Sequence, residues 1–363
     1  MDAVAARTEG NPLFVSEMVR FLAQSGGPVS SAPLPAGLRQ AMSARLRRVC
    51  EVGGPSCADV LAAAAVLGDD VDPAVVAAVL GRSLDSVLDA MTAPARAGLL
   101  LESAQPPLRY RFAHDLLREA AYAELTPLRR AQLHLLAGHV LARWEDQAER
   151  QPRIAHHLLR AIPAGVEAAG QAVEHAAAAG DQAVSALAYE DAARWYADAI
   201  AALDHAPAGT RARRCELLLR WGAALLAAGQ ISAAGPALEK ATALARHAAD
   251  ALLFGRAALL RTEHLDFNAV DRPAIALLSE AAELLAGTGN AIEARVLARL
   301  AVALRHAPAG AARDAAGRAV EIARRSDDPA ALATALSSQL YDRWGRHDPR
   351  TALAAADEIA TLA

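Results

Sequence analysis

Apolar and polar residues follow a helical period along most of the chain, and one short region follows the period of a strand. From about residue 127 onward, alanine and leucine recur at helical spacing. Residues 109–112 alternate polar and apolar side chains, as a half-buried strand does, and the run 98–103 before them is also strand-like. A proline-containing turn separates the two runs, so the pattern predicts a β-hairpin within a mainly α protein.

Helices are predicted on both sides of this hairpin. Those before it cover about residues 38–49, 57–67, 73–80 and 83–97. After it come His114 and Asp115, followed by apolar residues at helical spacing, and an acidic residue such as Asp115 favours a helix start. Helices followed by a small hairpin are the outline of a winged-helix unit, in which residues 109–112 form the second arm of the wing.

The region after residue 127 contains a repeat. Five frames with the same offsets of 0, 4 and 7 begin at positions separated by 42, 40, 38 and 40 residues: Ala192-Tyr196-Ala199, Ala234-Leu238-Ala241, Ala274-Leu278-Ala281, Ala312-Ala316-Ala319 and Ala352-Ala356-Ile359. Gly180 and Gly222 each precede a frame by twelve residues, whereas Thr262 stands where the next such glycine would fall. This spacing is similar to the tetratricopeptide pattern, in which stacked helical hairpins form one continuous core. The sequence therefore predicts an α-solenoid.

The composition and charge of the chain argue against nucleic acid and membrane as direct partners. Hydrophobic residues make up 54% of the chain but aromatic residues only 4%, so the core is mainly alanine, leucine and valine, which favours packed helices. The net charge of −4 and the low basic density of residues 73–97 argue against direct nucleic-acid binding. No apolar run reaches the roughly 18 residues that span a bilayer, and no signal peptide is recognisable. We therefore expect a cytoplasmic protein without a membrane partner.

Neither a metal site nor a catalytic site is expected. Cys50, Cys57 and Cys215 lack the paired spacing of a zinc site. His156 and His157 are adjacent, but neighbouring residues on a helix point about 100° apart and are poorly placed to share an ion. No Ser/His/Asp or Cys/His arrangement suggests nucleophilic catalysis.

Four segments together resemble one protein family. They read RTEGNPLFVSEMVRFL (7–22), LPAGLRQAMSARL (34–46), VLAAAAVLGDDVDPAVVAAVLG (60–81) and RYRFAHDLLREAAYAELTPLRRAQLHLLAGHVL (109–141). They are similar to the region that follows the nucleotide-binding core in bacterial signal-transduction ATPases of the AAA/STAND superfamily, particularly the large LuxR-type transcriptional regulators. Such proteins run in the order ATPase core, helical lid, winged helix, tetratricopeptide-like sensor array and DNA-binding helix-turn-helix.

The resemblance implies three parts. Residues 1–36 would be a lid-helix remnant of an ATPase module with a linker, residues 37–126 a winged-helix domain, and residues 127–363 a tetratricopeptide-like array truncated at its C-terminus. Both ends of the chain look cut, so we expect a fragment that lacks the P-loop core and the terminal helix-turn-helix.

The motifs of ATP hydrolysis are missing from the sequence. It contains neither GxxxxGK[ST] nor an apolar strand that ends in paired acidic residues. Phosphoryl transfer depends on such a phosphate cradle and on Mg²⁺. This chain is therefore not expected to be an enzyme. ATP or ADP would bind in the intact parent, and none is expected to bind strongly to this chain.

The resemblance implies two nucleotide contacts. The proline of the Gly-x-Pro turn, here Pro12, would lie against the adenine ring. His114 matches the histidine of the winged-helix Met-His-Asp motif, which contacts the β-phosphate of ADP in related proteins; Ala113 replaces the methionine here, and Asp115 is retained. On the residues alone, Pro12 fits a simple helix breaker and His114 a simple helix start as well as they fit nucleotide contacts. For each residue the structural and the nucleotide-binding interpretation therefore stay open.

Three functions are compatible with these observations. The first is the regulatory and sensor portion of a STAND-type regulator, whose partners would be its own ATPase core and a protein or small-molecule inducer bound to the repeat array. The second is a free-standing helical-repeat scaffold for protein partners. The third is the ATPase-repeat part of a nucleotide cyclase or kinase fusion.

Overall fold

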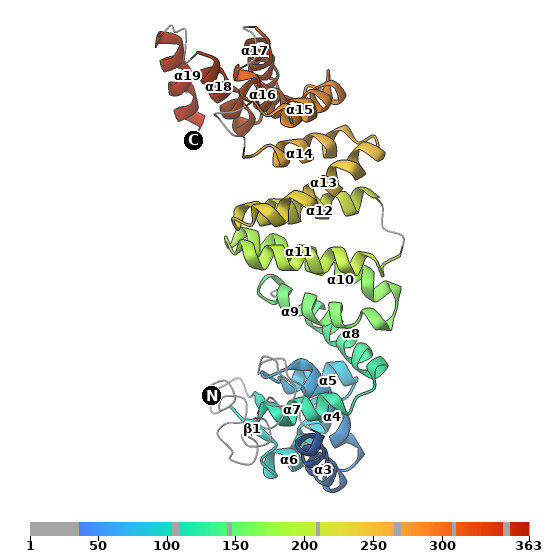
Figure 1. The fold of residues 1–363 in the computed structure, drawn as a ribbon. Coiled ribbons are helices and arrows are strands. Elements are labelled where there is room, and N and C mark those ends of the chain that lie inside the picture. Colours follow the sequence, from blue (N-terminus) through green and yellow to red (C-terminus); the bar gives the residue numbers. More distant parts are fainter. Residues whose placement is uncertain are drawn as a thin grey trace. The chain divides into compact units, whose positions relative to one another are not determined.

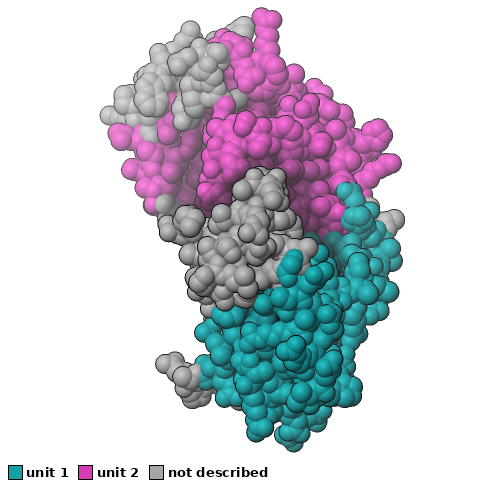
Figure 2. Space-filling view, turned by 60° about the horizontal axis from the view of Figure 1, so that its bottom comes forward, with its two compact units in different colours: residues 1–179, 204–207 teal, residues 180–203, 208–363 magenta. Residues whose placement is uncertain are grey.

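The computed structural model describes residues 36–103, 109–143, 147–207, 211–264, 270–306, 310–343 and 349–362 (Figure 1). The predicted lid segment 1–36, all but its last residue, and the proline-containing turn at 104–108 lie outside the described residues. The chain forms two compact units, which Figure 2 colours separately: residues 1–179 with 204–207, and residues 180–203 with 208–363.

The first unit contains the predicted hairpin and the helices around it. Its elements are α3 (Ala36–Gly53), α4 (Pro55–Leu67), α5 (Pro73–Leu80), α6 (Leu84–Arg96), β1 (Leu100–Glu102), β2 (Tyr110–Phe112), α7 (Asp115–Ala123), α8 (Pro127–Arg143), α9 (Gln147–Arg160), a 3₁₀ turn (Ile162–Ala164) and α10 (Val166–Ser185), within which the division between the units falls. The prediction of helices followed by a small hairpin is confirmed.

The hairpin is short, antiparallel and tied to the loop before α5. Leu100 pairs with Phe112 and Glu102 with Tyr110. Val71 and Tyr110 exchange two backbone hydrogen bonds of 2.8 and 2.9 Å, which extends the sheet by one bridge. Phe112, Tyr110 and Leu100 are buried, so apolar packing holds the hairpin against the helices.

The core of the first unit continues past the hairpin into α8. Leu116 and Leu117 of α7 are fully buried beside Met91 of α6. Leu133 and Ala137 of α8 belong to the same buried cluster, although they lie beyond residue 126, the predicted end of the winged-helix domain. The domain boundary at 126/127 stays a prediction.

The second unit is a succession of helical hairpins. It continues with α11 (Tyr189–Leu203), α12 (Arg211–Ala227), α13 (Ile231–His247), α14 (Ala251–Arg261), α15 (Arg272–Leu285), α16 (Ala291–Ala303), a 3₁₀ turn (Leu304–His306), α17 (Ala311–Ala323), α18 (Pro329–Arg343) and α19 (Pro349–Leu362). From α11 onward each helix packs on the next, and α12, α14, α16 and α18 also contact one another in turn (Figure 1). The mainly α fold with a helical-repeat solenoid is confirmed.

The repeat frames predicted from the sequence form the core of this solenoid. Every residue of the first four frames is buried, which places the alanines where helices of one hairpin meet. In the fifth frame Ala356 is exposed and Ile359 is half-buried. The small-residue spacing therefore marks the buried face in α11, α13, α15 and α17 but not throughout α19.

Glycines allow the closest helix approaches. A Cβ atom on Gly180 would lie 2.6 Å from the ring of Tyr196, and one on Gly222 would come closer still to the side chain of Leu238. The next such contact involves Gly255, where a Cβ would lie 2.7 Å from Leu285. The array thus has a third glycine at a helix crossing. The repeat spacing predicted it at position 262, where threonine stands, but it lies seven residues earlier, at Gly255.

A polar network fixes the register of the first repeat helices. The Tyr196 hydroxyl donates a 2.7 Å hydrogen bond to Asp181, and Arg220 donates to both oxygens of the same carboxylate at 3.0 and 2.8 Å. Arg220 also donates to Glu216 at 2.9 Å. Because these contacts join α10, α11 and α12, they specify one arrangement of surfaces that are otherwise mostly alanine and leucine.

Gly222→Ala is expected to destabilise the protein by about 1–3 kcal/mol, because the added methyl group would overlap Leu238 in a packed core. Gly317→Ala is the matched control. Nothing lies within 4 Å of a Cβ at Gly317, which is exposed within α17, so this change should stabilise by about 0.5–1 kcal/mol. Urea denaturation measures both. An unchanged midpoint for Gly222→Ala would show that the crossing has room to relax.

Candidate functional site

His114 lies at the junction between the hairpin and a helix. It is the N-cap residue of α7, with extended backbone angles (φ −142°, ψ 139°), and its carbonyl accepts the Leu117 amide at 2.9 Å. The Ala113 amide donates to the Leu99 carbonyl at 2.9 Å, which holds the strand end against the start of β1. The half-buried imidazole is therefore carried on a backbone anchored on both sides.

Ion pairs hold this junction to the loop before α5. Arg118 on α7 contacts Asp69 at 2.9 Å, and Arg109, directly before β2, contacts Asp72 at 2.8 Å. Asp72 also caps α5 by accepting the Ala74 amide at 2.8 Å. The loop, the hairpin and α7 thus form one connected polar surface around the helix that His114 begins.

Pro12, the other residue that the resemblance assigns to a nucleotide, lies outside the described residues. Its placement against an adenine ring and the role of His114 both stay predictions. The structure places His114 between the end of the hairpin and α7.

A buried histidine pair, which the sequence did not predict, joins α8 and α9. The Nδ1 atoms of His134 and His157 are 2.9 Å apart, and the Tyr122 hydroxyl lies 3.0 Å from His134 Nε2. Both imidazoles are almost fully buried, whereas His156 is exposed. One of the two Nδ1 atoms must carry the hydrogen and the other must accept it, so at least one of the two rings is neutral.

Burial lowers the pKa of His134 to about 4 and the pKa of His157 to about 3, and the positive charge of Arg160 contributes in both cases. The rings therefore remain neutral through the physiological range. Among the described residues, no group of three or more histidine, cysteine or acidic side chains is arranged to hold a metal ion.

The histidine pair should make stability depend on pH. The unfolded chain titrates near pH 6.5, so the contribution is complete above that pH and is lost as pH falls from 6.5 toward 4 and then 3. At pH 5 each histidine is expected to lower the free energy of unfolding by about 2 kcal/mol relative to neutral pH. Urea titrations between pH 7.5 and 4.5 measure this.

The double variant His134→Leu with His157→Leu is expected to lose most of this pH slope, whatever its absolute stability. His247→Ala, at an exposed position on α13, should keep the slope and serves as the control. An equal slope in the double variant and in the control would assign the pH dependence to other groups.

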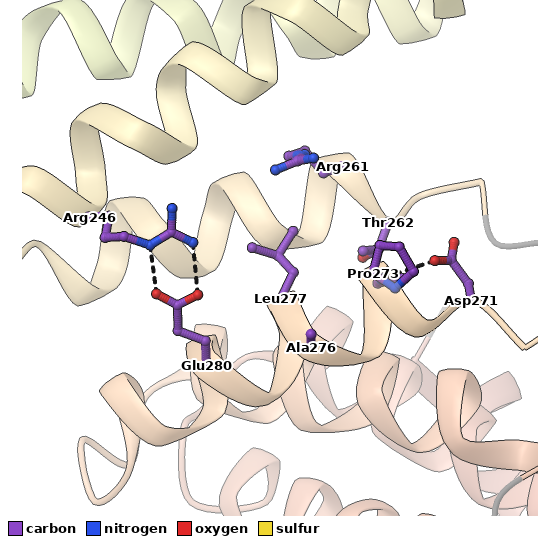
Figure 3. Close-up of a pocket in the computed structure, with 9 residues that line it drawn as sticks. Arg246, Arg261, Thr262, Asp271, Pro273, Ala276, Leu277 and Glu280 are labelled. Carbon is purple, nitrogen blue, oxygen red and sulfur yellow. Dashed lines mark hydrogen bonds and ion pairs between the residues drawn. The ribbon is translucent and has the colours of Figure 1, made fainter.

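A cavity of about 380 Å³ opens in the second unit, where α14 ends. Helix α14 has 11 residues and stops at Arg261, whereas α13 has 17 and α15 has 14. Residues from all three helices line the space: Arg246, Arg261, Thr262, Asp271, Pro273, Ala274, Ala276, Leu277 and Glu280 (Figure 3). The cavity lies where the short helix leaves a gap between its longer neighbours.

Three of the four charged side chains in the cavity already have partners. Arg246 donates through Nε and a terminal nitrogen to the two oxygens of Glu280, at 2.7 and 2.8 Å, and its guanidinium lies 5.0 Å from the centre of the Phe254 ring. Asp271 accepts the Ala274 amide at 2.9 Å as the cap of α15. Within the described part of the chain, exposed Arg261 forms no ion pair. Figure 3 shows it above Leu277.

A recurring ion pair is a sequence signal for this part of the array. The Arg246–Glu280 pair has a counterpart in Arg324–Glu358, where nitrogen and oxygen lie 3.1 Å apart, and both pairs span 34 residues. Each pair joins alternate helices of the array. An arginine and a glutamate recurring at this separation identify alternate helices that contact each other through an ion pair, although they do not identify the cavity beside them.

Comparisons with known proteins give a structural likeness. No protein-family model matches the chain, and no curated protein matches it. A crystal structure of a signal-transduction ATPase with numerous domains (STAND), a protein with a tetratricopeptide repeat sensor from Pyrococcus horikoshii, is similar to it with a TM-score of 0.42 and 12% sequence identity. The similarity covers 99% of this chain and 59% of that one.

The described residues include no helix with both the length and the apolar composition required to cross a lipid bilayer.

Proposed function

We propose that this chain is the regulatory and sensor portion of a cytoplasmic, bacterial STAND-type transcriptional regulator of the LuxR kind. Its role is to relay the state of a bound nucleotide and of an inducer, and it is not catalytic alone. In the intact parent, ATP or ADP would bind to an ATPase core that contacts this chain. A protein or small-molecule inducer would bind to the repeat array.

The observation that carries this proposal is the junction of β2 and α7. Two residues separate the end of β2 from the start of α7, and the second of them, His114, is the cap residue of the helix. A histidine at such a junction can donate a charge-assisted hydrogen bond to a phosphate, and its backbone transmits any displacement to the strand on one side and the helix on the other. Nucleotide-dependent switches require a contact of this kind that differs between two states.

The repeat array supplies the second property that a sensor needs. Stacked helical hairpins present an extended surface, and each repeat contacts mainly its neighbours, so a ligand bound to one hairpin alters a specific part of the array. The cavity at the end of α14 provides one site of suitable size in this surface.

The DNA that flanks the coding region tests the proposed function. We expect a segment encoding GxxxxGK[ST] upstream and a helix-turn-helix downstream, because the proposed switch needs both a nucleotide core and an output domain. A cyclase or kinase segment would assign the chain to a fusion enzyme instead. Stop codons and unrelated genes on both sides would favour a free-standing scaffold.

In the intact parent, His114→Ala is expected to weaken ADP binding by roughly 10- to 100-fold, the value of a charge-assisted hydrogen bond, and to raise basal transcription. Calorimetry with ADP and a promoter reporter measure the two effects. His247→Ala, on α13 of the repeat array, should change neither. Unaltered ADP affinity and basal output in the His114 variant would remove this residue from the switch.

A further inference from the structure

We infer that the cavity at the end of α14 binds a small organic anion, with its carboxylate or phosphate on Arg261 and its apolar part on Leu277 and Pro273. This inference rests on the proposed function, in which the repeat array receives the inducer, and it names the chemical class of that inducer.

The sign of the ligand's charge follows from the pairing inside the cavity. Arg246 neutralises Glu280 through two hydrogen bonds. Asp271 keeps its negative charge, which lies at the N-terminus of α15 and accepts the Ala274 amide there, where a helix end favours a negative charge. Arg246 is fixed by the same pair and by its position over Phe254. Arg261 therefore contributes the one positive charge without a partner among the described residues of the cavity. A guanidinium offers a planar set of donors that fits carboxylate or phosphate oxygens two at a time.

The remainder of the lining selects an apolar body. Leu277, Pro273 and two alanines, Ala274 and Ala276, supply the apolar part of the lining. The hydroxyl of Thr262 donates to the Ala258 carbonyl at 2.8 Å, so it is engaged within its own helix. Apart from Arg261 the lining has few free donors, so the oxygen acceptors of a ligand rich in hydroxyl groups would replace only part of their hydrogen bonds to water. The cavity thus favours a short hydrocarbon or aromatic group over a sugar.

The size of the cavity indicates a small molecule. Its volume of about 380 Å³ lies near the lower end of the range for small-molecule pockets, about 300–1,000 Å³. A ligand in this space contacts α13, α14 and α15 at once. It would therefore stabilise the arrangement of two adjacent helical hairpins, which is how occupancy would be communicated to the array.

Calorimetric and ligand-observed NMR titrations of the full chain test the inference with three probes: hexanoate, hexyl phosphate and hexan-1-ol. The two anions should bind saturably and the alcohol should bind at least tenfold more weakly. Comparing hexanoate with hexyl phosphate distinguishes a carboxylate ligand from a phosphate ester. Arg261→Gln should weaken both anions by roughly tenfold or more, because it removes the charged donor and leaves a neutral polar side chain.

Arg272→Gln is the matched control, since Arg272 is exposed at the start of α15, carries the same charge and does not line the cavity. It should leave both affinities within about twofold. Ala276→Leu, which narrows the cavity without changing its charge, should weaken the anions as well.

Three results would overturn the inference: no saturable binding of either anion, equal weakening by Arg261→Gln and Arg272→Gln, or binding of an acidic peptide where hexanoate and hexyl phosphate fail. Each of these can occur while the flanking DNA still encodes an ATPase core and an output domain, in which case the proposed function stands and the ligand assignment alone fails. Anion binding to Arg261 without those flanking domains would support the ligand assignment and contradict the proposed function.

Discussion

The close approach of helices at glycine is the constraint on which the repeat array depends. Gly180 admits the ring of Tyr196, Gly222 admits Leu238, and Gly255 admits Leu285. A core made largely of alanine offers little area per residue, so it gains stability mainly by bringing helices close enough for many weak dispersion contacts. Each large side chain that enters a glycine gap also sets the rotation of one helix against the next.

Polar contacts complement this packing by excluding alternative registers. The carboxylate of Asp181 receives Tyr196 and Arg220 together, which links three consecutive helices at one point. Farther along the array, Arg246 and Glu280 connect α13 to α15 across the end of α14. The second contact also determines which charges of the neighbouring cavity are satisfied, so the same interaction contributes to the fold and to the chemistry of the site.

Much of the fold was predictable from periodicity, because alternation and helical spacing record which face of an element is buried. The hairpin at Tyr110–Phe112 and the frame beginning at Ala234 were found in this way. The crossing at Gly255 was missed because ten residues separate α14 from α15, whereas three separate α12 from α13, so the glycine lies farther before its frame than the spacing predicts. The contact of His134 with His157 was missed because it depends on how two helices face each other. The cavity beside Arg261 was missed for the same reason, because no local sequence pattern records where three helices leave a gap. Pro12 lies outside the described residues, so its role stays a prediction.

Because α14 ends early, the helix crossing that stabilises the fold and the cavity that could hold a ligand involve different parts of this helix. The crossing at Gly255 lies in the first half of the helix, and the cavity lies at the other end, beside the last residue, Arg261. Extending the helix beyond Arg261 would reshape the cavity while the crossing stayed in place, whereas the last turn of the helix carries the buried Ala258. Related sequences can therefore differ in the shape of this cavity with little loss of stability, because residues beyond Arg261 can change while Gly255 and the buried residues of α14 stay the same.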